Sequence, residues 1–171
     1  MSEMFEGIVF RSTEPAAKQL FGNLTSALAL KLVSLSANIH GIYRSASRHE
    51  VFQTELLCQY AESLSEHTQS ALAVFYDNSC GLRTSVLFQP PAQHVQYGEN
   101  DEWWVELDDE GNPQIDGRKF RVSEFLPEAE YQTIYSAIDA GLEAMRINDS
   151  ISLDLLKNAF CYGKITPLME K

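Results

Sequence analysis

The first forty residues alternate between short apolar runs and turn-forming positions. Residues Phe5–Arg11 (FEGIVFR) have the length and apolar character of a strand. Ser12 or Thr13 follows, with Glu14 and Pro15 directly behind. This order is typical of a helix start, because Ser and Thr cap helix N-termini and proline is tolerated in the first turn. The pattern predicts a first strand followed by a helix.

The most apolar window of the chain runs from Leu24 to Ile39. Its large apolar residues recur three or four positions apart, at Leu24, Leu28, Leu32, Leu35 and Ile39. This spacing favours a buried helix that ends before Gly41, and it also allows a strand in part of the window. The window is too short to cross a bilayer, which takes about 20 residues, and Lys31 lies at its middle.

A second helix is predicted from a start signal and from the spacing behind it. Ser47 and Glu50 form the S-x-x-E pattern of a capping box, in which the two side chains satisfy backbone donors at a helix N-terminus. Apolar residues then follow at helical spacing: Phe52, Leu56, Tyr60 and Leu64. We therefore expect a helix that begins at this box.

Strand-length apolar runs dominate the middle of the chain. Residues Ser70–Asp77 and Leu82–Gln89 are joined by the turn-rich sequence NSCG and predict a hairpin that ends at Pro90 and Pro91. The stretch EWWVELDD (residues 102–109) is separated from RKFRV by two turn signals, Glu110-Gly-Asn-Pro113 and Asp116-Gly117. These short segments predict a meander.

The C-terminal part of the chain returns to helical spacing. Apolar residues stripe residues Tyr131 to Met145, and Pro127, Glu128 and Glu130 supply a helix start whose acids favour the helix dipole. Another helix is indicated by Leu153, Leu156 and Phe160. The order of elements predicts an α+β fold, with an antiparallel or mixed sheet that includes a meander and packs against helices. No repeat or linker divides the chain, so residues 1–171 are expected to form a single domain.

Charge changes this picture, because it is concentrated in one segment. The net charge is −11, and residues 99–130 carry 11 acidic and 3 basic side chains, so −8 of the total lies there. Such a field repels nucleic acid and anionic membranes and attracts cationic partners. A solvated loop that only keeps the protein soluble is the alternative interpretation.

The tryptophans of this acidic segment favour a binding role. In a strand, Trp103, Val105 and Leu107 would share one face, and Trp104 would lie among acids on the other. An aromatic side chain ringed by carboxylates has the composition of an interface anchor, unless another part of the chain covers it. The candidate partner-binding residues are Glu99, Asp101, Glu102, Trp104, Glu106, Asp108, Asp109, Glu110 and Asp116.

Searches for catalytic and metal-binding motifs give no match. His49-Glu50 begins like the zinc motif HExxH, but Gln53 stands where the second histidine belongs. The stretch from Asp108 resembles a calcium loop, yet Pro113 and Lys119 occupy the positions of the required Gly and Glu. There is no GxSxG, GxGxxG or Walker loop. We therefore expect no enzyme activity, no cofactor and no metal.

Cysteines and the N-terminus favour a reducing compartment. Cys58, Cys80 and Cys161 are odd in number and form no CxxC pair, which is typical of reduced, mostly buried thiols. The N-terminal residues MSEMFEGIVF lack the basic flank and apolar run of a secretory signal. These features predict a cytoplasmic location.

Small size, the acidic aromatic stretch ENDEWWVELDDEGNPQID and the absence of a signal together resemble bacterial immunity proteins. These antitoxins neutralise the toxin domains of contact-dependent growth inhibition and other polymorphic toxin systems. The resemblance implies binding to a cognate toxin domain, usually a basic one such as a nuclease, at its active site or at an exosite. Two other functions stay open at this point: an adaptor or subunit of a housekeeping complex, and a small enzyme without a known motif.

Overall fold

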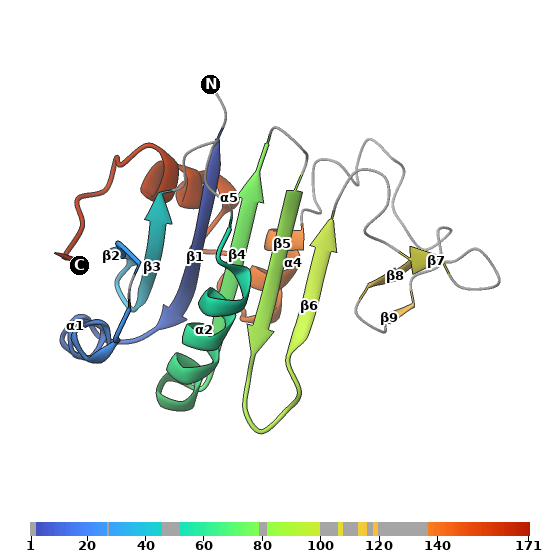
Figure 1. Ribbon diagram of the computed structural model, residues 1–171, viewed down its shortest axis with the longest axis horizontal. Coiled ribbons are helices and arrows are strands. Elements are labelled where there is room, and N and C mark those ends of the chain that lie inside the picture. The colour runs from blue at the N-terminus through green and yellow to red at the C-terminus, as the bar shows by residue number, and fades with distance from the viewer. Residues whose placement is uncertain are drawn as a thin grey trace.

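A seven-stranded antiparallel sheet forms the centre of the computed structural model, which describes residues 3–26, 28–45, 52–78, 82–99, 106–107, 113–115, 118–119 and 137–171 (Figure 1). The strand order is β10-β2-β3-β1-β4-β5-β6. The strands are β1 (Met4–Arg11), β2 (Lys31–Ser36), β3 (Ile39–Ser45), β4 (Ala71–Asp77), β5 (Leu82–Phe88), β6 (Val95–Glu99) and β10 (Met169–Glu170). The predicted α+β class is confirmed, and the sheet is antiparallel.

Helices cover both faces of this sheet (Figure 1). One face packs against α1 (Glu14–Asn23) and α2 (Thr54–Thr68), and the other packs against α4 (Ala137–Ala144), α5 (Leu153–Leu156) and the π-helix η2 (Lys157–Cys161). Two separate apolar cores result. In β1, Phe5 and Val9 belong to the core under α5 and η2, and Ile8 and Phe10 belong to the core under α1 and α2. A strand with both faces buried carries apolar residues at successive positions, as β1 does at Ile8, Val9 and Phe10.

The first strand and the first helix agree with the sequence prediction. Thr13 is the N-cap of α1, and its side chain accepts a hydrogen bond from the backbone N–H of Ala16. Pro15 lies in the first turn, where its missing N–H costs nothing. The sequence predicts this helix start correctly because the capping residue and the proline act over only a few positions.

The helix expected over residues 24–39 is wrong, and only the strand alternative is confirmed. Residues Lys31–Ser36 form β2, which pairs with β3 across a tight turn. The apolar spacing was misleading because β2 is covered on both faces: Leu32 enters one core, and Val33 and Leu35 enter the other. Apolar residues on two faces cannot be distinguished by spacing from one helical stripe.

The predicted capping box does not begin the second helix. Helix α2 starts at Thr54, its N-cap is Gln53, and that side chain makes no capping hydrogen bond. Ser47 and Glu50 lie outside the described residues. Of the predicted stripe, Leu64 is buried, whereas Phe52, Leu56 and Tyr60 are only half-buried. The other buried positions of α2 are Leu57, Ala61 and Ser65.

The hairpin and the later helices follow the prediction in part. Strands β4 and β5 pair from Ala71↔Phe88 to Asp77↔Leu82. Helix α4 lies within the predicted stripe, whose first part falls outside the described residues, and α5 continues into η2. The sequence interpretation missed β6 and β10, which are short edge strands with little apolar alternation.

A second, smaller antiparallel sheet follows β6 in the chain. It consists of β7 (Glu106–Leu107), β8 (Pro113–Ile115) and β9 (Arg118–Lys119), in the order β7-β8-β9. Figure 1 places it beyond β6, and β8 lies close to that strand. The predicted meander is confirmed for these residues.

Close packing of Phe160 against the central strands joins η2 to the sheet. The Phe160 ring lies 4.7 Å from the Tyr43 ring in a stacked arrangement and 5.3 Å from the Phe5 ring in an edge-on one. Gly7 and Gly41 lie directly beneath it: a Cβ at Gly41 would approach Phe160 Cζ to 2.7 Å. Glycine at these two positions therefore allows the aromatic ring to reach the backbone.

Replacing Gly41 by alanine tests this close approach. We expect the Gly41→Ala variant to lose about 1–3 kcal/mol of unfolding free energy, because the added methyl group overpacks a rigid core. Gly22→Ala is the matched control: nothing lies within 4 Å of that Cβ, and alanine in a helix is favoured over glycine by about 0.5–1 kcal/mol. Urea unfolding monitored by circular dichroism measures both. Equal effects in the two variants would contradict the packing argument.

Candidate interaction surface

The described residues include the start of the predicted binding segment and one of its inner positions. Glu99 is the last residue of β6, and Glu106 is the first residue of β7. The extended backbone predicted around Glu106 and Leu107 is confirmed. The other candidate residues lie outside the described residues: Asp101, Glu102, Trp104, Asp108, Asp109, Glu110 and Asp116, together with Trp103.

Strand register places these two glutamates on different sheets. Glu99 is opposite Arg83 at the end of the β5–β6 ladder, and Glu106 is opposite Gln114 in the small sheet. Strand β6 is an edge strand, so the acidic segment starts where the large sheet ends.

Two cations converge on one buried tyrosine near the start of the acidic segment. Arg83 Cζ lies 6.0 Å from the centre of the Tyr76 ring, and Lys157 Nζ lies 5.0 Å from the same ring. Tyr76 is 2% exposed and stacks on Phe5 with 5.3 Å between the ring centres. Cations at this distance from an aromatic face are held by its quadrupole. The sequence did not reveal this group, because η2 and the β4–β5 hairpin are distant in the chain.

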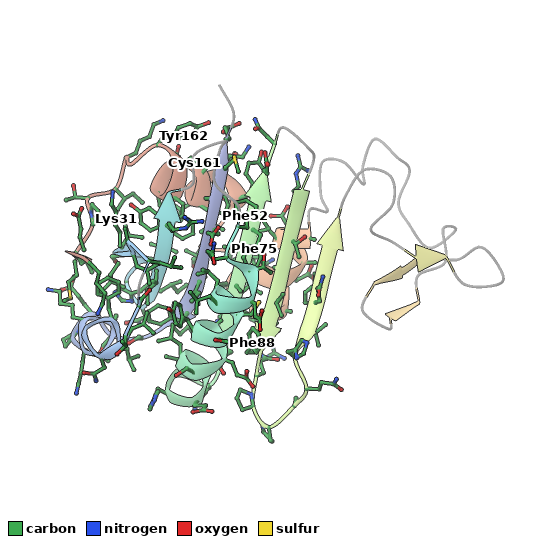
Figure 2. The ribbon with its side chains drawn as sticks, viewed as in Figure 1. Lys31, Phe52, Phe75, Phe88, Cys161 and Tyr162 are labelled. Atoms are coloured by element: carbon green, nitrogen blue, oxygen red, sulfur yellow. The ribbon has the colours of Figure 1, made fainter. Side chains whose placement is uncertain are left out.

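A polar contact beside this tyrosine ties three distant segments together. The Tyr162 hydroxyl donates a hydrogen bond to the Glu3 carboxylate, and this bond is the main reason why the pKa of Tyr162 rises to about 12. Glu3 also exchanges hydrogen bonds with Asn78: its N–H donates to Oδ1 at 2.8 Å, and its Oε1 accepts from Nδ2 at 3.1 Å. Figure 2 shows Tyr162 beside Cys161 at the end of η2. This contact has a structural role, because the polar groups of Glu3, Asn78 and Tyr162 are hydrogen-bonded to one another.

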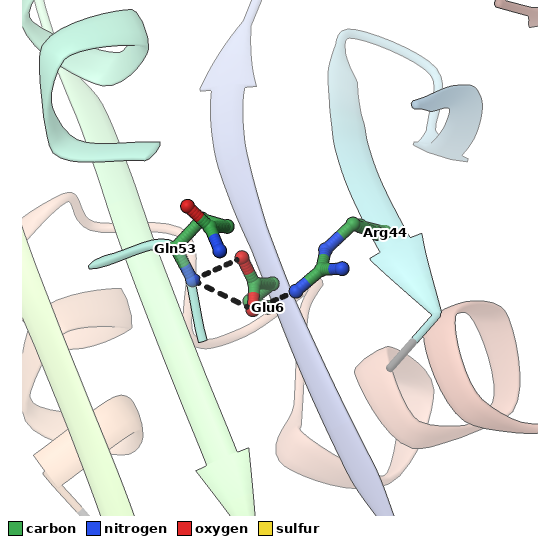
Figure 3. Close-up of polar contacts among 3 residues, drawn as sticks. All are labelled: Glu6, Arg44 and Gln53. Carbon is green, nitrogen blue, oxygen red and sulfur yellow. Dashed lines mark hydrogen bonds and ion pairs between the residues drawn. The ribbon is translucent and has the colours of Figure 1, made fainter. Parts of the chain in front are cut away.

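A fully buried carboxylate, Glu6, lies in the central strand β1. Its side chain is fully buried and accepts from Arg44 Nη2 at 3.2 Å (Figure 3). Both carboxylate oxygens also accept from the backbone N–H of Gln53, at 3.0 and 3.3 Å. Glu6 therefore satisfies the backbone N–H of the N-cap residue Gln53, one of the free donors at the start of α2, and its negative charge lies at the positive end of that helix.

Histidine and cysteine chemistry in the described residues does not assemble a site. No group of three metal-ligating side chains occurs there, and His67 and His94 are exposed. Cys58 and Cys161 are free and half-buried, and burial raises the pKa of each thiol to about 11, so neither forms a reactive thiolate at neutral pH. Cys80 and His49 lie outside the described residues.

No helix within the described residues is long and apolar enough to cross a membrane. Comparison with protein-family models, with curated protein sequences and with solved structures gives no significant match to this chain.

Removing the Glu6 carboxylate tests its structural role. We expect Glu6→Ala to cost about 3–5 kcal/mol of unfolding free energy, because Arg44 and the N-terminus of α2 would both lose their buried partner. Lys18→Ala is the control: Lys18 pairs with Glu14 at 3.9 Å on the exposed surface of α1, and such pairs contribute about 0–1 kcal/mol. Chemical denaturation compares the two. Similar losses of unfolding free energy in the two variants would show that the buried contacts of Glu6 contribute no more than an exposed ion pair.

Acid sensitivity is expected at His40, which is fully buried beside Phe10. Burial lowers its pKa below 6.5, although the nearby Glu14 charge opposes this. The unfolded chain therefore binds a proton at His40 more readily than the folded chain does. The contribution of neutral His40 to the unfolding free energy is fully present above pH 6.5 and is lost as the pH drops toward the lowered pKa. The loss is at most about 1.4 kcal/mol per pH unit. A His40→Phe variant, measured by urea unfolding at pH 7.5 and 5.5, should lose less stability than the wild type between these values. An unchanged difference between the two proteins would refute the assignment to His40.

Proposed function

We propose that this chain is an immunity protein that binds and neutralises a cationic toxin domain, such as a nuclease, through residues Glu99 to Asp116. The observation that carries the proposal is the charge: −8 of the net −11 lies in residues 99–130. A domain that acts on nucleic acid carries Lys and Arg to hold phosphates. Carboxylates gathered on one segment would occupy the positions that phosphates take.

The position of the segment beyond an edge strand supports this proposal. Its first member, Glu99, ends the edge strand β6, and Glu106 begins the small sheet. Trp104 lies in the same stretch of sequence, and large aromatics dominate the energetics of protein interfaces. We place this encounter in the cytoplasm, where such an antitoxin would meet an incoming toxin.

Electrostatic steering makes a specific claim about salt. Exposed charges are screened over about 8 Å at physiological ionic strength, so the association rate with a cationic partner should fall as salt rises. The contact of an aromatic anchor is less sensitive to salt, because it depends on buried apolar area. Binding should therefore persist at high salt but form more slowly.

Affinity capture from bacterial lysate at low and high salt tests the function. The tagged wild-type chain is compared with a Trp104→Ala, Glu106→Lys double variant, and retained proteins are identified by mass spectrometry. We expect one basic toxin-like protein to be retained by the wild type and lost by the variant, since the variant removes the aromatic anchor and reverses a charge.

The matched control reverses one charge elsewhere. Glu143→Lys alters an exposed acid of α4 and changes the net charge by the same amount as Glu106→Lys. Capture of the basic partner should be unchanged in this control. An identical list of retained proteins for the wild type and the double variant would remove the acidic segment from the proposal and favour an adaptor in a constitutive complex.

A further inference from the structure

The imidazole of His40 is fully buried and makes no hydrogen bond. His40 lies in β3, directly opposite Phe10 of β1 and Ser34 of β2. Neither of its ring nitrogens has a hydrogen-bond partner among the residues that the structure describes. A neutral imidazole carries one N–H donor, and a buried donor without an acceptor costs free energy. This side chain therefore contributes no polar contact that would explain its place in the core.

Helix α1 covers the imidazole. His40 and Phe10 are directly opposite on neighbouring strands, so both side chains point to the same face, and their rings are 6.2 Å apart. Phe10 belongs to the core under α1 and α2, and α1 lies against β2 and β3 (Figure 1). The carboxylate of Glu14, at the start of α1, acts electrostatically on His40. The imidazole is therefore enclosed between the sheet and the N-terminal end of α1.

One charge faces this imidazole in the part of the chain that the structure describes. It is Glu14, which also pairs with Lys18 at 3.9 Å on the exposed surface of α1. The opposing residues of β1 and β2 are uncharged. Arg11 points to the other face of the sheet, where its Nη2 donates to the carbonyl of Arg146 at 2.9 Å. Burial lowers the pKa of His40 more than Glu14 raises it, so the covered ring is neutral at neutral pH.

Helix α1 can leave the sheet more easily than α2. Its buried residues are Ala17 and Phe21, whereas α2 buries four residues and has its own contacts with β1, β4 and β5. A groove of about 630 Å³ lies between the two helices. A free helix shorter than about 12–15 residues is marginal in water, and α1 has 10 residues. Once detached, α1 would therefore lose its helical hydrogen bonds while α2 stays in place.

We propose that His40 acts as a pH-sensitive switch, which releases α1 from the sheet in mildly acidic solution while the other elements stay folded. An imidazolium carries two N–H donors and a positive charge, and the cost of burying them exceeds what the nearby Glu14 charge returns. Both donors and the charge become hydrated once α1 leaves, so proton uptake favours the open state. Release exposes the apolar residues that α1 covers. The switch is separate from residues Glu99 to Asp116 and does not depend on the function proposed above.

Native-state hydrogen exchange followed by NMR tests the switch on the full-length protein. The amides of Ala17, Lys18 and Phe21 in α1 are compared with those of Ala73 and Val74 in β4. We expect the opening equilibrium of α1, corrected for the intrinsic exchange rate, to rise by up to about tenfold from pH 7.5 to pH 5.5. This is the limit for one histidine whose pKa in the open state is about 6.5. Low urea concentrations should change this opening little, because the urea dependence scales with the surface exposed.

Three variants assign the effect to a residue. His40→Phe removes the titrating group and keeps an aromatic ring in the core, so the opening of α1 should no longer depend on pH. The matched control, His94→Phe, replaces an exposed histidine before β6 and should keep the full rise. Glu14→Gln should also keep it, because Glu14 opposes the effect of burial. The ring carbons of wild-type His40 give a measurement that needs no variant: the ring should stay neutral at pH values where exposed His67 is protonated.

Several results would overturn the proposal. The first two are an opening of α1 that does not change with pH in the wild type, and a rise of equal size in His40→Phe. Loss of the rise in Glu14→Gln would assign the titration to Glu14 instead. A His40 ring that titrates like His67 while α1 stays closed would show that its protonation does not release the helix. Exchange of the α1 amides with the same rates and urea dependence as the β4 amides would show that α1 opens only when the whole fold does.

Discussion

The structure depends on the central strand β1, which is paired with a strand on each edge and packed against helices on each face. Its backbone pairs with β3 on one edge and β4 on the other, and helices cover the residues that point to each side. Two residues of this strand meet special demands. A polar side chain at this depth needs its own partners, which Glu6 finds in Arg44 and Gln53. Gly7 gives up its side chain so that the Phe160 ring can lie against the strand.

These contacts also explain where surfaces are available. One specific contact in each helical layer reaches β1: the Phe160 ring of η2 lies against Gly7, and Glu6 accepts from the backbone of Gln53 at the start of α2. At the β6 margin the chain leaves the large sheet at Glu99 and enters the acidic segment. On the opposite face, α1 and α2 pack on the sheet through Phe21 and Leu57, and a groove of about 630 Å³ lies between the two helices.

Local signals in the sequence were sufficient for β1, the start of α1 and the β4–β5 hairpin, because capping residues, turns and apolar runs act over a few positions. They failed where the deciding partner is remote. The cap of α2 comes from Glu6, 47 positions before Gln53, and no local pattern reveals it. The apolar spacing of β2 predicts a helix because its apolar residues are divided between two cores rather than gathered in one. For the candidate binding segment, the strand predicted at Glu106 is confirmed because alternation is a local signal. The groove between α1 and α2 is formed by two helices that are distant in the chain, so no sequence pattern predicts it.

Carboxylates and an aromatic anchor in one binding segment would affect binding kinetics in different ways. The carboxylates act at a distance, so their main effect is on the rate of association, and that effect weakens as salt screens the charges. An aromatic side chain acts through apolar contact at close range, so its main effect is on the rate of dissociation. A partner that met only the carboxylates would show salt-dependent association with rapid dissociation. A partner that also buried the aromatic side chain would dissociate slowly even at high salt, because salt does not screen apolar contact.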